Sequence, residues 1–179
     1  MPAERKYGRI EWERRFLLDR FPRGAVVTRV RRITDRYIEG TSLRLRQQTD
    51  SDGTTIFKLT QKLGDQAERA RQGLITTMYL IDVEFSVLAK LPARALTKTR
   101  HSVPPFGIDV FEGVLRGLVM AEAEFNSATE AAALTLPFFI RQEVTEDPRF
   151  TGGSLVAAAR QEVESWLAQH GIKLTAPTD

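Results

Sequence analysis

The sequence predicts a mainly β protein of the α+β class, built as an antiparallel barrel of seven to eight strands with few helices. Strand-length segments follow one another along the chain and are separated by turns rich in glycine, proline and aspartate. Within these segments, like charges recur at alternate positions and the intervening residues are largely apolar. Since residues two apart in a strand point to the same face, each strand has one charged and one apolar face.

The charges form five pairs, and their number matters more than any one of them. They are Glu11/Glu13, Arg44/Arg46, Lys58/Lys62 (with Thr60 between), Lys98/Arg100 and Glu122/Glu124. One such pair is typical of a strand face in water. Five pairs with apolar intervening residues favour a charged lumen whose apolar outside is covered by other elements. A lumen holding both acids and bases suits a polyanion together with its metal ion.

The first half of the chain reads as strands joined by turns. A turn with Pro22 and Gly24 follows the first segment, Gly40 lies in a tight turn, and the Asp-Ser-Asp-Gly stretch at 50–53 predicts a hairpin. The polar stretch 64–73 is expected to be a loop or a short helix. The expected strands cover 8–18, 27–38, 42–48, 54–62 and 74–81.

The second half adds three further strands and most of the helices. Asp82 is a plausible N-cap for a helix over 82–91, and Ser127 caps a short helix over 127–134. Strands are expected over 95–102, 107–113 and 118–125, with a brief one at 142–145. An amphipathic pattern predicts a terminal helix over 154–169 that Gly171 ends. We expect one domain over 1–179, with a barrel over about 8–150 and a C-terminal helix over about 154–170.

Composition narrows the chemistry and the location. The 179 residues include no cysteine and two histidines, which excludes thiolate and His-rich metal sites and disfavours a Ser-His-Asp triad. Any metal must be held by carboxylates, which favours Mg²⁺ or Mn²⁺. The sequence shows no apolar span of about 18 residues and no signal-peptide core, so we expect a cytoplasmic protein without membrane contact. Bases alternate with acids and few aromatic residues lie among them, which disfavours nucleic-acid binding.

The expected lumen charges suit a phosphate chain. The bases are Arg15, Arg44, Arg46, Lys58, Lys62, Lys98 and Arg100, and the acids are Glu11, Glu13, Asp109, Glu122 and Glu124, which gives a net charge of +2. One or two divalent cations would bring this lumen close to the charge of a linear triphosphate, about −4 to −5. No glycine-rich phosphate loop is present in the sequence, so side chains must do the recognition.

Seven short motifs, in order, resemble the CYTH family, the triphosphate tunnel metalloenzymes, which include bacterial inorganic triphosphatases and thiamine-triphosphatase-like proteins. The resemblance implies an eight-stranded antiparallel tunnel whose charged lumen binds triphosphates with Mg²⁺ or Mn²⁺. The motifs are IEWERRFLL (10–18), YIEGTSLRLRQ (37–47), KLTQK (58–62), LTKTRHS (96–102), GIDVFEG (107–113), LVMAEAEF (118–125) and QEVTEDPRF (142–150).

The resemblance also implies roles for the lumen residues. Glu11, Glu13 and Glu124, with Glu122 nearby, would hold the metal. Tyr37 could help position the attacking water, Asp109 would hold the bases in place or assist a second metal, and Lys58 shares the strand face of the substrate-binding bases. The phosphate chain would lie against Arg44, Arg46, Lys62, Lys98 and Arg100.

Three departures from the family pattern stand out. Arg15 replaces the final lysine of the opening motif, and arginine cannot transfer a proton. On the middle strand, Thr76 and Met78 take the expected positions of two glutamates, which affects a second metal site. A late Arg/Tyr-x-Asn loop is replaced by residues 149–153, a change expected to carry no chemical weight.

The resulting hypothesis is metal-dependent hydrolysis of inorganic tripolyphosphate or an organic triphosphate. Two alternatives stay open: an adenylate cyclase, for which no adenine pocket is identified, and a module that binds triphosphate or inorganic polyphosphate without turnover. The sequence does not distinguish these activities. It also leaves open the physiological substrate, the preferred metal and the oligomeric state, with a homodimer as one candidate.

Overall fold

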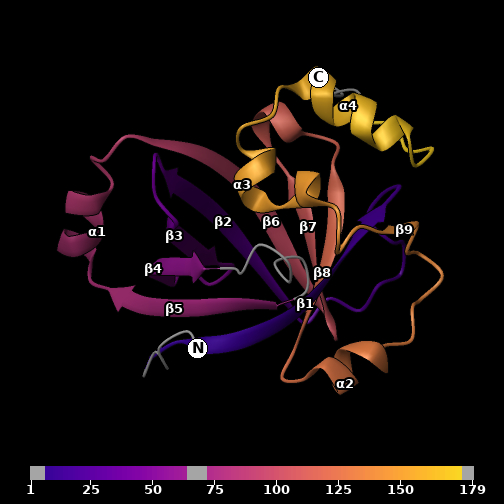
Figure 1. The fold of residues 1–179 in the computed structure, drawn as a ribbon, viewed down its shortest axis with the longest axis horizontal. Coiled ribbons are helices and arrows are strands. Elements are labelled where there is room, and N and C mark those ends of the chain that lie inside the picture. Colours follow the sequence, from indigo (N-terminus) through magenta and orange to yellow (C-terminus); the bar gives the residue numbers. More distant parts are fainter. Residues whose placement is uncertain (1–6, 64–71, 175–179) are drawn as a thin grey trace.

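Eight strands close into an antiparallel barrel in the computed structural model, which describes residues 7–63 and 72–174. Around the barrel the order is β5-β4-β3-β2-β6-β7-β8-β1, and β1 closes the ring by pairing with β5 (Figure 1). The strands are β1 (Arg9–Leu18), β2 (Arg29–Ile38), β3 (Leu43–Asp50), β4 (Thr55–Leu63), β5 (Gln72–Leu80), β6 (Ala93–Val103), β7 (Phe106–Phe111) and β8 (Val119–Phe125). The eight-stranded closed barrel expected from the sequence is therefore confirmed.

The first strand, β1, is long enough to join both ends of the sheet. Its first residues pair with β5, from Arg9 opposite Ile75, and its later residues pair with β8, from Trp12 opposite Phe125. The short strand β9 (Gln142–Glu143) adds to the same strand outside the ring. As a result β1 carries its lumen-facing side chains past three other strands.

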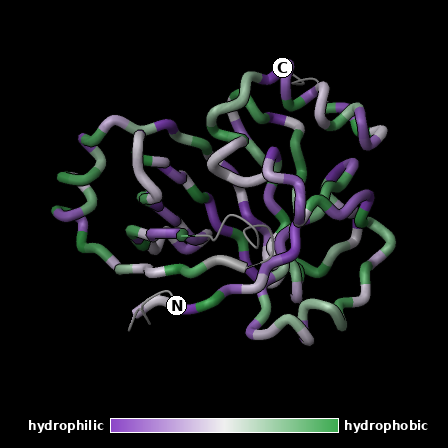
Figure 2. The backbone as a smooth tube through the Cα atoms, in the orientation of Figure 1, coloured by the Kyte–Doolittle hydropathy of each residue, from purple (hydrophilic) through white to green (hydrophobic). Residues whose placement is uncertain are grey.

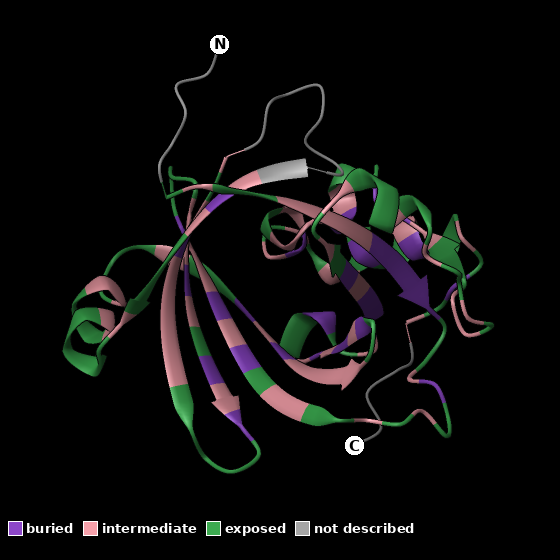
Figure 3. Cartoon of the chain, turned by 90° about the horizontal axis from the view of Figure 1, so that it is seen from below, coloured by how far each residue is buried: buried purple, intermediate pink, exposed green. Residues whose placement is uncertain are grey.

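Hydrophilic and hydrophobic residues alternate along the strands of the barrel wall. Figure 2 shows the hydropathy of each residue along the backbone. On β1, Glu13 and Arg15 contact other charged side chains, whereas Phe16 and Leu18 belong to an apolar cluster with Phe106 and Ile108. The segment between β8 and β9 supplies Phe139 and Ile140 to that cluster and contains α2 (Ala128–Ala132). The predicted arrangement, charged inside and apolar outside under a cover, is confirmed for this side of the barrel. Figure 3 shows how far the residues of each strand are buried.

One part of the lumen is apolar and lies against the C-terminal segment. Leu17, Leu96, Phe111 and Met120 form one cluster with Phe150 and with residues of the last helices. This segment contains η2 (Pro148–Phe150), α3 (Gly152–Leu155) and α4 (Arg160–Ala168), while η1 (Gly113–Leu115) precedes β8. Burial of these side chains anchors the C-terminal segment to the barrel.

The terminal helix differs from the sequence expectation, because α3 and α4 are separate. The Glu162 carboxylate accepts a hydrogen bond from the Ala159 backbone N–H at 2.7 Å, which fixes a new helix start there. Gly171 follows the helix with a φ of 70°, as expected of a stop.

The helix α1 (Asp82–Leu88) also begins differently. Its N-cap is Ile81, whose N–H bonds the Glu84 carboxylate, so Asp82 lies in the first turn instead of capping it. Phe85 stacks on Phe57 of β4 with ring centroids 4.3 Å apart, which holds α1 against the outer wall. Ser127 caps α2 as predicted. Most of the stretch expected to be a polar loop, 64–71, lies outside the described residues.

No helix within the described ranges 7–63 and 72–174 is long and apolar enough to cross a membrane.

Candidate functional site

Asp35, on β2, holds two arginines of β3 in the lumen. Arg46 bonds both Asp35 oxygens, Nε to Oδ1 at 2.6 Å and Nη2 to Oδ2 at 2.8 Å, and Arg44 Nε lies 3.6 Å from Oδ1. Burial of the carboxylate, which is 1% exposed, would by itself raise its pKa, but the attraction of Arg46 and Arg44 lowers the pKa of Asp35 to about 2. The two arginines are therefore oriented before any ligand arrives.

Asp109, on β7, likewise holds two bases of β6 in the lumen. Its carboxylate accepts from Lys98 Nζ at 2.5 Å and from Arg100 Nε and Nη2 at 2.7 and 2.6 Å. Arg100 also bonds Glu122 of β8. Although burial would raise the pKa of Glu122, Lys98 and Arg100 hold it well below its ordinary value. The expectation that Asp109 holds the bases in place agrees with these contacts.

The β1 carboxylates lie beside those of β8. Glu13 is the register partner of Glu124, and it pairs with Arg15 and, at 2.9 Å, with Lys62. Burial, followed by repulsion from Glu124, raises the pKa of Glu11, although Arg9 bonds Glu11 at 3.0 Å. Carboxylates from two strands thus crowd one side of the lumen.

These carboxylates have the chemistry that a hard divalent cation requires. Glu124 pairs with no base among the described residues, and its charge repels that of Glu11. The other carboxylates already form ion pairs: Glu13 with Arg15 and Lys62, and Glu122 with Arg100. As the described side chains stand, no three carboxylates or histidines group closely enough to form a metal centre. The carboxylate ligands fit Mg²⁺ or Mn²⁺ by their chemistry. To bind the cation, they would have to leave the basic side chains with which they now pair.

Arg15 is held by the chain that follows β9. Its Nη2 donates to the Thr145 carbonyl at 2.5 Å, its backbone N–H bonds Thr145 Oγ1 at 3.1 Å, and its side chain also pairs with Glu13. The side chain is almost fully buried. Arg15 therefore orients Glu13 and ties β1 to the C-terminal segment.

Tyr37 lies between Arg44 of β3 and the C-terminal segment. It is partly buried and hydrogen-bonds Arg44, and burial followed by the nearby Asp35 charge raises the pKa of Tyr37 to about 12. A Cβ atom added at Gly152 would lie 2.0 Å from the Tyr37 hydroxyl. The 149–153 loop, expected to carry no chemical weight, therefore makes room for Tyr37 with a glycine. A role of Tyr37 in positioning water stays a prediction.

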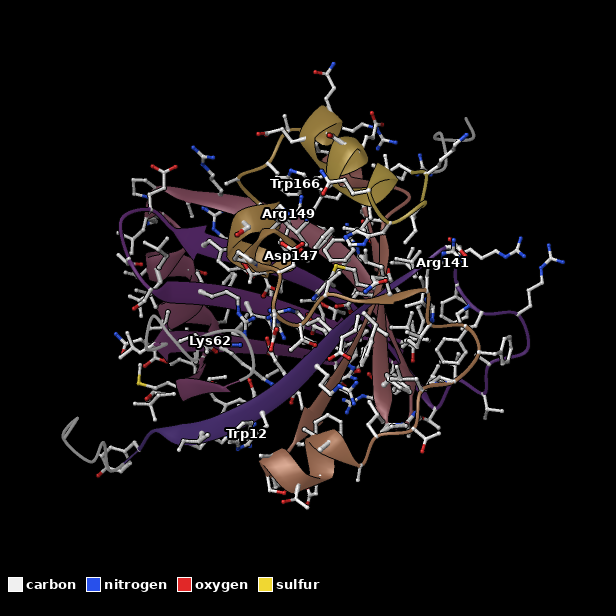
Figure 4. The ribbon with its side chains drawn as sticks, turned by 45° about the vertical axis from the view of Figure 1, so that its right-hand side comes forward. Trp12, Lys62, Arg141, Asp147, Arg149 and Trp166 are labelled. Carbon is white, nitrogen blue, oxygen red and sulfur yellow. The ribbon has the colours of Figure 1, made fainter. Side chains whose placement is uncertain are left out.

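The neighbouring Arg149 holds this segment in place. It bonds Asp147 at 2.6 Å through Nη2, and its guanidinium lies 5.9 Å from the centre of the Trp166 ring of α4 (Figure 4). These contacts attach the late loop to α4.

The lumen faces of β4 and β5 lack acids where their side chains are described. Cross-strand partners share a face, and the register pairs Lys62 with Ile75, Thr60 with Thr77 and Lys58 with Tyr79. Thr60 and Thr77 hydroxyls lie 3.1 Å apart, and Lys58 Nζ lies 5.1 Å from the Tyr79 ring centre. Ile75, Thr77 and Tyr79 therefore face inward.

The expected placement of Thr76 and Met78 in the lumen is wrong, because both alternate with these inward residues and face outward. The absence of glutamate from the described inner face of β5 nevertheless holds.

Among the lumen residues that the sequence patterns did not reveal are Asp35 and Arg31. They share one face of β2 with Tyr37, and Arg31 is the register partner of Arg100. The signal was the alternation at 31, 33, 35 and 37. Charged residues on the outer face obscured it, since Arg32 pairs with Glu112 and Arg36 bonds the Ala89 carbonyl.

Comparison with known proteins gives one strong relative. No family model matches the chain. It is 36% identical over 157 residues to the inorganic triphosphatase of Nitrosomonas europaea, an alignment that covers 81% of this chain and 95% of that protein. Two crystal structures, of the hypothetical protein NE1496 and of the inorganic triphosphatase NE1496, match with TM-scores of 0.54 and 0.53 and 28% identity. Each covers 83% of this chain, and 99% and 95% of the solved chains respectively.

Proposed function

Because the chain belongs to the CYTH family, the triphosphate tunnel metalloenzymes, we propose that it hydrolyses inorganic tripolyphosphate in its barrel lumen with the help of Mg²⁺ or Mn²⁺. The observation that carries the proposal is the convergence of four buried or partly buried bases on two carboxylates. Arg44 and Arg46 meet at Asp35, and Lys98 and Arg100 meet at Asp109. The name of the Nitrosomonas europaea relative supports the choice of substrate.

The bases would bind and orient the phosphate chain. Guanidinium groups at Arg44, Arg46 and Arg100 can bond phosphate oxygens in pairs, whereas Lys98 and Lys62 act as point charges. Asp35 and Asp109 hold four of these bases in the lumen. Preorganised cations stabilise the charge that develops on the phosphoryl oxygens as the terminal bond breaks.

The carboxylates Glu11, Glu13 and Glu124, with Glu122, would hold the cation on the opposite side of the phosphate chain. A divalent cation bound there supplies charge neutralisation and an activated water. If phosphate oxygens drew Lys62 and Arg100 away, Glu122 and the Glu13 oxygen that does not pair with Arg15 would become available as ligands. The substrate would thus help to form the metal site. This agrees with the ion pairs that these carboxylates make in the structure.

The test is phosphate release from tripolyphosphate, ATP and thiamine triphosphate with Mg²⁺ or Mn²⁺. We expect release from tripolyphosphate, and at least about a hundredfold loss in the Glu11→Gln/Glu13→Gln variant. Glu39→Gln, at an exposed turn, is the matched control and should keep full activity. Equal rates in the double variant and the wild type would contradict the proposal. Cyclic AMP in place of phosphate from ATP would instead indicate a cyclase.

A second candidate is binding of the same phosphate chain without turnover. The observation in its favour is the inner face of β5, where Ile75, Thr77 and Tyr79 supply no carboxylate. Calorimetry that shows tight tripolyphosphate binding, with no phosphate released over hours, would select this function.

A further inference from the structure

Arg31 is a lumen arginine that the proposed phosphate site does not use. It lies on β2, six residues and about 20 Å along the strand from Tyr37. Its register partner on β6 is Arg100, and its partner on β3 is Asp50. Arg31 therefore stands next to a base of the phosphate site.

The charge of Arg31 is poorly compensated. Its Nη2 donates to Ser102 Oγ at 2.6 Å, its Nε is buried without a hydrogen-bond partner, and it makes no ion pair among the described residues. Asp50 is taken by Arg29, whose Nε lies 2.7 Å from Oδ1. Burial, then repulsion from Arg100 and Arg29, lowers the pKa of Arg31, and the attraction of Asp50 and Asp109 does not offset this lowering. Like charges directly opposite each other across two strands are destabilising.

The direction of the side chain matters as well. Ser102, which it contacts, lies two residues beyond Arg100 on β6, about 7 Å further along the strand. Lys98, Arg100 and the Arg31 guanidinium thus form one row of donors along the lumen. The opposite part of the lumen is occupied by apolar side chains, among them Leu96 and Phe111. A phosphate chain longer than the central site would next meet the donors of this row.

We propose that Arg31 and Ser102 form an additional phosphate subsite, which extends the ligand class of the lumen to linear polyphosphates of four or more phosphates. The inference rests on the proposed function, since the central bases must hold the first three phosphates. The subsite offers the remaining Nη hydrogens of Arg31, together with the hydroxyl of Ser102, to the oxygens of one phosphate.

The experiment is titration calorimetry of wild type, Arg31→Ala and Arg32→Ala with tripolyphosphate and tetrapolyphosphate, in EDTA to prevent turnover. Arg32 is on the same strand but faces outward, so its removal controls for net charge. In Arg31→Ala we expect about tenfold weaker binding of tetrapolyphosphate and less than about twofold change for tripolyphosphate. Arg32→Ala should change neither. Arg31→Lys keeps the charge and should recover part of the loss, which shows that the effect is not misfolding.

The outcomes separate the two proposals. If wild type binds neither phosphate chain, with or without Mg²⁺, the proposed function fails and the subsite fails with it. If wild type binds both chains, and Arg31→Ala weakens both equally or weakens neither, the proposed function survives and the additional subsite is refuted.

Discussion

On the lumen wall made by β2, β3, β6 and β7, four bases converge on two carboxylates that solvent scarcely reaches, Asp35 and Asp109. The wall made by β4 and β5 instead presents Lys58 and Lys62 beside threonine, isoleucine and tyrosine side chains. We call these the carboxylate-rich wall and the carboxylate-poor wall. On the carboxylate-rich wall, ion pairs within the wall fix the bases before a ligand binds. On the carboxylate-poor wall, the lysines contact no carboxylate of β4 or β5. Lys62 reaches across to Glu13 of β1, and Lys58 lies over the Tyr79 ring.

This difference assigns the two walls different tasks. Bases held by buried carboxylates recognise a phosphate chain with little loss of side-chain freedom. Lysines on the opposite wall keep flexible stems and can follow the ligand. The carboxylate-rich wall should therefore determine both stability and binding geometry, while the carboxylate-poor wall should tune affinity.

The largest effect is expected at Asp109, which is fully buried and bonds two bases. Asp109→Ala leaves Lys98 and Arg100 without this shared partner, so we expect a loss of about 3–5 kcal/mol in the free energy of unfolding. Lys58→Ala on the carboxylate-poor wall should cost less than about 1 kcal/mol. Urea unfolding measures both. Similar losses in the two variants would contradict the difference between the walls.

The charge pairs predicted the barrel because a strand repeats every two residues and each pair marks one face. That rule failed on β5, where LITTMYLI has no charges and its phase is set by pairing with β4. It also failed on β2, where Arg32 and Arg36 on the outer face hid Asp35 and Arg31. The break between α3 and α4 was missed because the apolar pattern continues across it, and a local contact of Glu162 decides the boundary. Tertiary partners, which local patterns do not encode, account for each of these failures.

The pH dependence of stability offers a second test of the carboxylate-rich wall. The pKa of Asp35 is about 2 in the fold and ordinarily 3.8. A lowered pKa in the folded state means that the unfolded chain binds the proton more readily. Its contribution, about 2 kcal/mol, is therefore complete above pH 4 and is lost as the pH falls toward 2. Asp35→Asn should flatten the unfolding free energy over that range, whereas Glu39→Gln should not. An unchanged slope in Asp35→Asn would count against the Arg44–Asp35–Arg46 arrangement.

The contact between the carboxylate-rich wall and the C-terminal segment can be tested with paired glycines. An added Cβ at Gly152 would lie 2.0 Å from the Tyr37 hydroxyl, whereas one at Gly153 would lie 4.0 Å from the nearest Tyr37 atom. Gly152→Ala should therefore displace Tyr37, cost about 1–3 kcal/mol of stability and raise KM for tripolyphosphate through Arg44. Gly153→Ala should do neither.

Tyr37→Phe removes the atom that the new methyl group would strike. The nearest remaining ring atom is 3.0 Å from the added Cβ. In a Tyr37→Phe background, Gly152→Ala should cost distinctly less than in the wild type. Equal costs in the two backgrounds would show that the Tyr37 hydroxyl does not limit residue 152.

The smallest expected effect is on the carboxylate-poor wall, and it depends on which face of β5 is inside. Thr77→Glu places an acid near the phosphate chain, so repulsion should weaken tripolyphosphate binding in EDTA about fivefold, or roughly 1 kcal/mol. Met78→Glu adds the same charge on the outer face and should leave binding unchanged. Calorimetry compares the two variants directly. Because they differ by one position, the reverse result would place Met78 in the lumen and overturn the inward assignment of Thr77. The expected result would instead show that the absence of acids from the carboxylate-poor wall favours binding of the polyanion. The carboxylate-rich wall differs, because it needs acids to hold its bases.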